Sequence, residues 1–216
     1  MQRRRDRAYT RFLSRVWLPL SCLITGSAQA APADLRKVAH AYYVWRDAAY
    51  PVSTSFLGDH RLDDKLTDYR MPAVLERRKH VAALLTQVGG MDVSSWSKED
   101  RVDQLLFLSQ LKAADFFGRR LDPERRDPQL YVTECTNGLF TLLQKEYAPP
   151  RVRALAAQKR LEAMPGLLRT ARTNLTQPVR LFAQLAIRAA REGDALYKES
   201  LAPLVAALSP EEQKRF

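Results

Sequence analysis

The residue types that could do chemistry are few in this chain and lie far apart. The histidines are His40, His60 and His80, and no two of them have the four-residue spacing that places two imidazoles on one helix face to hold zinc. The densest group of imidazole and carboxylate side chains is one short segment, Asp59-His60 with Asp63-Asp64. A metal site needs its ligands fixed by supporting hydrogen bonds, and we interpret this segment instead as a solvated or helix-capping loop.

Cys135 and the paired carboxylates form no recognisable catalytic arrangement either. Cys135 has no neighbouring histidine and no C-x-x-C partner, which favours a small buried residue over a nucleophile. The pairs Glu99-Asp100 and Glu211-Glu212 lie in the first turns of predicted helices, where the helix dipole explains them. Phosphate-binding glycine loops, G-x-S-x-G elbows and dinucleotide fingerprints are absent from the sequence. We therefore predict no catalytic, cofactor-binding or metal-binding residue in this chain.

The first thirty residues have the three-part order of a secretory signal peptide. Arginines from Arg3 to Arg15 precede an apolar stretch over 16–24, and Ala28-Gln29-Ala30 forms an A-x-A site before Ala31. The apolar stretch is about ten residues long, whereas a helix needs about 20 to cross a bilayer. A lipoprotein signal would use Cys22, but its lead-in is poor, and a twin-arginine signal has only the adjacent arginines in its favour. We predict cleavage between Ala30 and Ala31, export to the periplasm or beyond, and no membrane span after cleavage.

The positive charge does not by itself indicate a nucleic-acid partner. The net charge is +11, of which residues 1–30 contribute +5 through six arginines and one aspartate. The other basic residues are mixed with acidic ones, and their clusters do not alternate with aromatic residues as a base-stacking surface would. We therefore predict that the chain binds no nucleic acid.

Composition and patterning predict an all-α fold with one ordinary core. The sequence is 46% apolar and 27% charged, which is too hydrophobic for disorder, and it has only 8 glycines. Alanine, leucine, arginine and glutamine are abundant and lose little entropy in a helix. Apolar residues recur at three- and four-residue steps. We predict about eight helices with proline-marked connections, over 33–50, 72–88, 98–117, 130–147, 151–164, 165–175, 179–193 and 194–208.

The longest segment without helical periodicity runs from Tyr50 to Asp68. Pro51 ends the first helix or restarts it, residues 52–57 have room for one or two helical turns, and Gly58 stops them. The polar residues that follow predict an ordered loop between two helices.

Other features predict how the helices are packed and divided. The apolar face of helix 98–117 is wide, which is typical of a central helix covered on several sides. Residues 119–128 are strongly charged and are predicted to form a loop. Pro165 should start a new helix and Gly193 should end one. Arg78 is the one charged residue that we place on the apolar stripe of helix 72–88, with its stem over the core and its head in water.

Three segments together carry a family resemblance. They are YPVSTSFLGDHRLDDKLTDY (50–69), SWSKEDRVDQLLFLSQL (95–111) and RVRALAAQKRLEAMPGLLRTARTNLTQPVRLFAQLAI (151–187). Each is weak alone, but their order and spacing resemble the bacterial "domain of unknown function 885" family over roughly residues 35–216.

The resemblance implies a larger parent protein. The family is similar to helical zinc carboxypeptidases, and its zinc motif, His-Glu followed by Pro-Gly-His, lies downstream of the matched region. This chain has no match to that motif, so no ligand or catalytic residue can be carried over. The resemblance thus implies zinc, a peptide substrate and a C-terminal catalytic half for the full-length protein. Residues 31–216 would be the helical front half, walling one side of a peptide-binding groove and inactive alone.

Three hypotheses follow. The first is this non-catalytic front part of an exported zinc-dependent peptidase, which agrees with a well-capped helix that starts at Ser209-Pro210 and stops at Phe216, as in a truncated chain. The alternative is a self-contained periplasmic helical binding or interaction module without catalysis. The third is a basic nucleic-acid binder, whose affinity would depend steeply on salt.

Overall fold

The structure is a computed structural model that describes residues 30–214, so the predicted signal peptide lies outside the described residues except for Ala30. The all-α prediction is confirmed, because no strand occurs in the described range. None of the helices there has the length and apolarity that crossing a bilayer requires. The longer elements are α1 (Pro32–Ala49), α3 (Met71–Gly89), α4 (Lys98–Phe116), α6 (Pro128–Leu143), α7 (Pro150–Asn174) and α8 (Arg180–Ala195).

Short helical segments join or extend these long helices. They are α2 (Pro51–Phe56), the π-helix η1 (Phe117–Leu121), α5 (Pro123–Arg126), the π-helix η2 (Leu196–Ser200), α9 (Ala202–Val205) and α10 (Pro210–Gln213). As predicted, Pro51 opens a short helix, and Gly58 follows it with a φ of 95°, a conformation that glycine adopts without strain.

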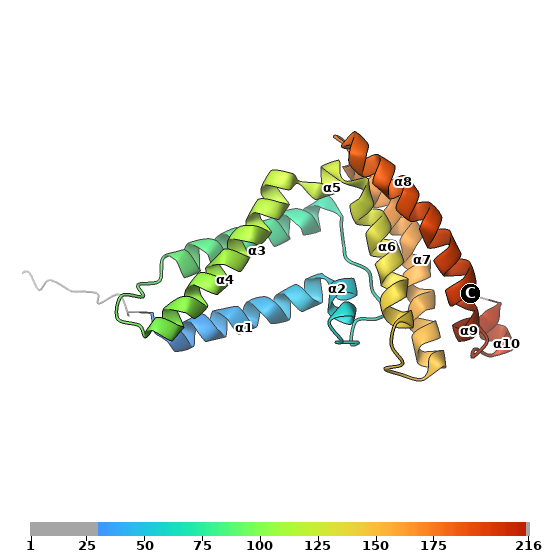
Figure 1. Ribbon diagram of the computed structural model, residues 1–216, viewed down its shortest axis with the longest axis horizontal. Helices are drawn as coiled ribbons and strands as arrows, with labels where there is room; N and C mark the ends of the chain where they lie inside the picture. Colours follow the sequence, from blue (N-terminus) through green and yellow to red (C-terminus); the bar gives the residue numbers. More distant parts are fainter. Residues whose placement is uncertain (1–29, 215–216) are drawn as a thin grey trace, which may run out of the picture.

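The long helices form two groups that diverge from each other (Figure 1). The first group contains α1, α3 and α4, with a core that includes Leu35, Val88 and Leu111. The second contains α6, α7 and α8, with a core that includes Tyr131 and Leu139. Residues 57–70 form a segment of turns and irregular structure that runs from α2 to the start of α3 and passes beside α6 (Figure 1). We call residues 57–70 the strap.

The most enclosed helix is α6 and not α4. Helix α6 packs against α2, α5, α7 and α8, and its Leu139 and Leu142 are fully buried. Helix α4 buries only Gln104, Phe107 and Leu111. Its second apolar face is exposed, which means that the prediction of a central helix covered on several sides is wrong. The side chains of this uncovered face, with those of η1, are Val102, Leu105, Leu106, Phe116, Phe117 and Leu121.

Residues 119–128 are not a loop as predicted. The chain continues from α4 into η1 and, after Asp122 with a φ of 47°, into α5. Arg78 of α3 stabilises this turn through ion pairs of its Nη2 with Asp122 Oδ1 at 2.5 Å and Glu124 Oε2 at 2.6 Å. The head of Arg78 therefore reaches two carboxylates and not open water.

Two predicted helix boundaries are also wrong, and tertiary packing explains both. Pro165 lies inside the continuous helix α7, whose buried face runs through Ala157, Met164 and Leu167 on both sides of the proline. Burial of that face outweighs the backbone hydrogen bond that the proline removes. Gly193 lies inside α8, where a Cβ atom would come within 2.8 Å of Thr136 Cγ2 on α6. This glycine allows α6 and α8 to pack closely and does not end the helix.

Candidate functional site

The strap is held by a fully buried arginine. The Arg160 side chain of α7 is 0% exposed. Its Nε donates to Lys65 O at 3.0 Å, and its Nη1 donates to Gly138 O at 2.5 Å and Thr141 Oγ1 at 3.0 Å. Its Nη2 donates to Ser55 Oγ at 2.7 Å and Leu62 O at 3.4 Å. Burial lowers the pKa of Arg160, an effect that the nearby Asp63 carboxylate opposes. All five N–H groups thus have acceptors, and one side chain joins α2, the strap, α6 and α7.

Asp63 is the acidic counterpart in the same cluster. Its Oδ1 accepts from Ser55 Oγ at 2.6 Å, and its Oδ2 lies 3.0 Å from His60 Nδ1 and also accepts from the Tyr147 hydroxyl. The His60 and Tyr147 rings stack with centroids 3.3 Å apart. Burial and the hydrogen bond to Asp63 raise the pKa of Tyr147. Each polar atom of Asp63 is thus used for structure, and the segment predicted as an ordered loop is locked in place.

The second half of the strap is tied to α6 and α7 by two more buried side chains. Glu134 Oε1 accepts from Thr67 N at 2.7 Å. Asn174 Nδ2 donates to Tyr69 O at 2.7 Å and to Tyr131 Oη at 3.0 Å. Burial raises the pKa of the Tyr69 hydroxyl well above its ordinary value. These bonds fix the position of Tyr69, which forms part of the pocket described next.

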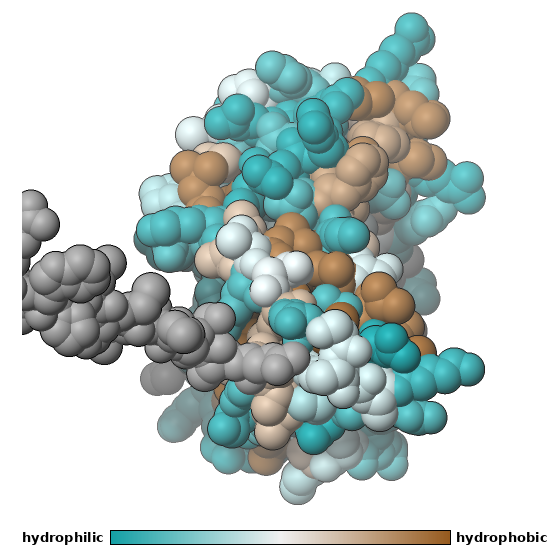
Figure 2. Space-filling model, turned by 90° about the vertical axis from the view of Figure 1, so that its left-hand side faces the viewer, coloured by the Kyte–Doolittle hydropathy of each residue, from teal (hydrophilic) through white to brown (hydrophobic). Residues whose placement is uncertain are grey.

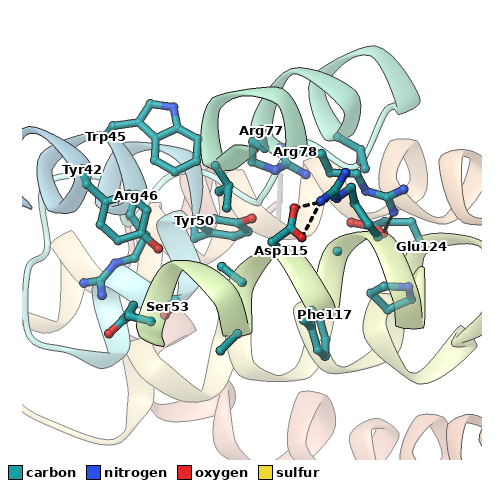
Figure 3. Close-up of a pocket in the computed structure, with 18 of the residues that line it drawn as sticks. Tyr42, Trp45, Arg46, Tyr50, Ser53, Arg77, Arg78, Asp115, Phe117 and Glu124 are labelled. Carbon is teal, nitrogen blue, oxygen red and sulfur yellow. Dashed lines mark hydrogen bonds and ion pairs between the residues drawn. The ribbon is translucent and has the colours of Figure 1, made fainter. Parts of the chain in front are cut away.

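A pocket of about 700 Å³ lies between α1, α3 and α4, at the side of the first helix group that faces the strap. This volume is in the range of sites for small molecules, about 300–1,000 Å³. Aromatic and apolar side chains form much of its wall (Figure 3). Those used below are Tyr42, Tyr50, Tyr69, Leu106, Ala113 and Phe117.

Arginines from three elements line the same pocket, and most of them have carboxylate partners. Arg46 Nη2 lies 2.7 Å from Asp47 Oδ1, and Arg119 Nη2 lies 2.7 Å from Asp115 Oδ2. Arg78 pairs with Asp122 and Glu124 as described above, and although burial favours its neutral form, these bonds raise its pKa. Each of these three arginines therefore has a carboxylate that balances its positive charge.

Arg77 is the exception among the arginines of this pocket. It is 9% exposed, and its Nη1 donates to Asp68 O at 2.7 Å. Its Cζ lies 5.2 Å from the ring centroid of Tyr50 and 5.8 Å from that of Tyr69. Its Nη2 is buried and has no hydrogen-bond partner within residues 30–214, and no ion pair of Arg77 occurs there. Burial raises the pKa of Tyr50, and the charge of Arg77 partly offsets that shift. The pocket therefore contains a buried guanidinium whose Nη2 is without a hydrogen-bond partner and which forms no ion pair among residues 30–214.

The sequence-predicted candidates do not converge on a site. His40 is exposed, and His80 packs against Trp45 with ring centroids 4.2 Å apart. Asp59 pairs with Arg61 at 2.6 Å, and this bonding lowers the pKa of Asp59 to about 2. Across residues 30–214, no group of three or more His, Cys, Asp or Glu side chains could hold a metal ion.

Both pairs of carboxylates lie in first helical turns, as predicted, and one member of each pair caps its helix. Asp100 bonds with Ser97 at the start of α4 and pairs with Arg36 at 3.0 Å. Glu212 accepts from Ser209 N at 2.9 Å in a capping box at α10. Hydrogen bonds from Ser209 and Arg151 lower the pKa of Glu212.

Cys135 is 5% exposed on α6, and burial, aided by the Glu134 charge, raises the pKa of its thiol to about 11. At pH 8 only about a thousandth of such a thiol is thiolate, compared with about a quarter of a free one. We expect alkylation of Cys135 by iodoacetamide to be about a hundred-fold slower or more in the folded chain than in the denatured chain. A chain carrying Cys22→Ser isolates this thiol, and equal rates in the two states would contradict the assignment.

The two arginines that matter most were missed by reasoning from sequence. Arg77 continues the buried stripe of α3 through Val74, Val81, Leu84 and Val88, and this register shows that the stripe position belongs to Arg77 and not to Arg78. Arg160 lies on the buried stripe of α7 between Ala157 and Met164. The sequence did contain a signal for both. Each arginine lies three residues after one buried apolar residue of its helix and four residues before the next.

Comparisons with known proteins concern family and fold. No curated protein matches the chain. A solved structure titled "a putative lipoprotein of unknown function from Shewanella oneidensis" has 20% sequence identity and a TM-score of 0.73. The match covers 86% of this chain and 34% of that one, so the chain spans about a third of that structure's length and shares its fold there. Residues 51–215 match the family described as bacterial protein of unknown function, DUF885. The chain belongs to the DUF885 family.

Proposed function

We propose that this chain is the non-catalytic front part of an exported, zinc-dependent peptidase or carboxypeptidase-like protein. In the parent protein it forms one wall of a peptide-binding groove, and alone it is inactive. The description of the Shewanella oneidensis protein as a lipoprotein, and the predicted signal peptide, support export. The resemblance of the family to helical zinc carboxypeptidases supports the peptidase activity.

The observation that carries this proposal is the amount of apolar surface on the long helices. Leu105 and Leu106 of α4 are 62% and 65% exposed, and Leu181 and Ile187 of α8 are 58% and 55% exposed. Apolar side chains also reach the surface at several places on the face in Figure 2. We attribute this exposed apolar surface to a contact with another protein segment. The missing C-terminal catalytic half is the partner that we propose for it.

The residues that the structure describes, 30–214, do not form a zinc site. A catalytic zinc needs three protein ligands and an open position, and the described residues bring no such group together. The zinc of the proposed parent protein would be bound by residues outside this chain. We therefore derive no catalytic step here.

The alternative is a self-contained helical binding or interaction module without catalysis. The observation in its favour is the pocket of about 700 Å³ that side chains of this chain line. This alternative predicts a soluble monomer that folds cooperatively. The front-part proposal predicts aggregation and binding of dyes that report exposed apolar surface.

The test compares the printed chain with the product of its full natural gene. We expect the full product to bind about one zinc ion and to cleave peptides in a reaction that a chelator stops. We expect the printed chain to do neither. Zinc content is measured by mass spectrometry and cleavage with a mixture of peptides. Peptide cleavage by the printed chain, or a zinc-free and inactive full product, would contradict the proposal.

A further inference from the structure

We propose that the pocket between α1, α3 and α4 binds an organic carboxylate through Arg77. This inference concerns binding by the described residues and does not depend on zinc or on peptide cleavage. The carboxylate has two possible sources, a small organic acid and the C-terminus of a peptide, and both present the same group to Arg77.

Three observations support the binding of an anion beside Arg77. The guanidinium is buried, with 9% exposure, and its Nη2 lacks a hydrogen-bond partner among residues 30–214. Leaving such a donor buried and unused is costly, so a ligand that accepts its hydrogen bonds gains more than at an exposed arginine. The Nη1 bond to Asp68 O and the Tyr50 and Tyr69 rings hold the guanidinium in place before any ligand arrives. Tyr50, Arg77 and Asp115 come from different elements and line the same pocket (Figure 3).

The charges around the pocket favour one negative charge over two. Arg46 and Arg119 each pair with one carboxylate and Arg78 pairs with two, which leaves Arg77 as the arginine of this pocket without a carboxylate partner among residues 30–214. Asp115 and Glu124 line the same pocket and would repel a doubly charged phosphate. A monovalent carboxylate fits this balance.

The walls favour an apolar body behind that carboxylate. Leu106, Ala113 and Phe117 line the pocket from α4 and η1, and Tyr42 lines it from α1. Such apolar surface stabilises a hydrocarbon or aromatic group by removing it from water. The proposed ligand is therefore an organic acid with an apolar or aromatic body, or a peptide that ends in such a residue.

The experiment uses the chain of 216 residues. It is titrated by calorimetry with benzoate and with benzamide, a neutral compound of the same shape. Hydrogen bonds to charged groups contribute enough for about a ten-fold or larger preference, so we expect benzoate to bind at least that much more tightly. Arg77→Gln should lower benzoate affinity about ten-fold or more. The control, Arg70→Gln, removes an exposed arginine of the strap and should leave the affinity unchanged.

A second variant separates binding from folding. Arg77→Gln also removes a bond to the strap, whereas Ala113→Leu fills the pocket and touches none of the hydrogen bonds of Arg77. Leucine at this position takes up part of the pocket, so we expect Ala113→Leu to lower benzoate affinity about ten-fold with an unchanged circular dichroism spectrum. Unchanged affinity in this variant would overturn the proposal, as would equal binding of benzoate and benzamide.

Two further titrations identify the source of the carboxylate and compare carboxylate with phosphate as the bound anion. An acetylated tripeptide ending in phenylalanine is compared with its C-terminal amide, and tighter binding of the free acid than of benzoate assigns the site to peptide ends. Tighter binding of benzoate assigns it to small acids. Inorganic phosphate should bind more weakly than benzoate, and the reverse order would contradict a carboxylate site.

Discussion

Arg160→Met is expected to lower the free energy of unfolding by about 3–5 kcal/mol, the range for breaking a buried charged network. The methionine fills a similar volume but donates no hydrogen bond. It would leave Lys65 O, Gly138 O and Leu62 O without their donor, and Asp63 without the nearby positive charge. Urea denaturation followed by circular dichroism measures the change.

The matched control lies on the same helix. Arg172 of α7 is exposed, and Arg172→Met should change the free energy of unfolding by less than about 0.5 kcal/mol. Arg160→Lys should be nearly as destabilising as Arg160→Met, since one ammonium group cannot reach the acceptors that the planar guanidinium serves. Equal stabilities of Arg160→Met and Arg172→Met would show that the strap is held by other contacts.

Leu139→Ala is expected to cost about 2–5 kcal/mol of stability, because it opens a cavity in the most enclosed helix. Leu139 is 0% exposed and belongs to the core that α6 shares with α7. The surrounding helices limit how far the cavity can collapse. The same denaturation experiment measures this loss.

Leu105→Ala removes the same atoms from α4, where the side chain is 62% exposed. We expect it to change stability by less than about 1 kcal/mol and to lower the tendency to aggregate. The pair tests which helix is central, since a central α4 would make Leu105→Ala the more destabilising of the two changes.

Local signals predicted much of the fold. Pro51, Pro72 and Pro210 each stand at the start of a helix, because a fixed φ and a missing N–H suit a first turn whatever the rest of the protein does. Pro165 and Gly193 were misjudged because their outcome depends on contacts with distant residues. The exposure of the second apolar face of α4 could not be predicted either. The spacing of apolar residues identifies an apolar face, but it does not show whether another segment packs against that face.

The candidate site was harder to predict than the fold. Its central residue, Arg77, resembles a solvated charge in sequence, and only the packing of α3 shows that it is buried. The acceptors of Arg160 are mainly backbone carbonyls of the strap and α6, which no residue pattern identifies. Conversely, the Asp59–Asp64 segment looked like the best ligand cluster, whereas its Asp59, His60 and Asp63 side chains form hydrogen bonds within the fold.

The most direct test of the account is to read the coding DNA past the codon for Phe216. We expect an in-frame continuation that encodes His-Glu followed by Pro-Gly-His, the zinc motif that the family resemblance implies. That result would supply both the zinc ligands and a segment to cover α4 and α8. A stop codon directly after Phe216 would contradict the front-part proposal and leave the self-contained binding module.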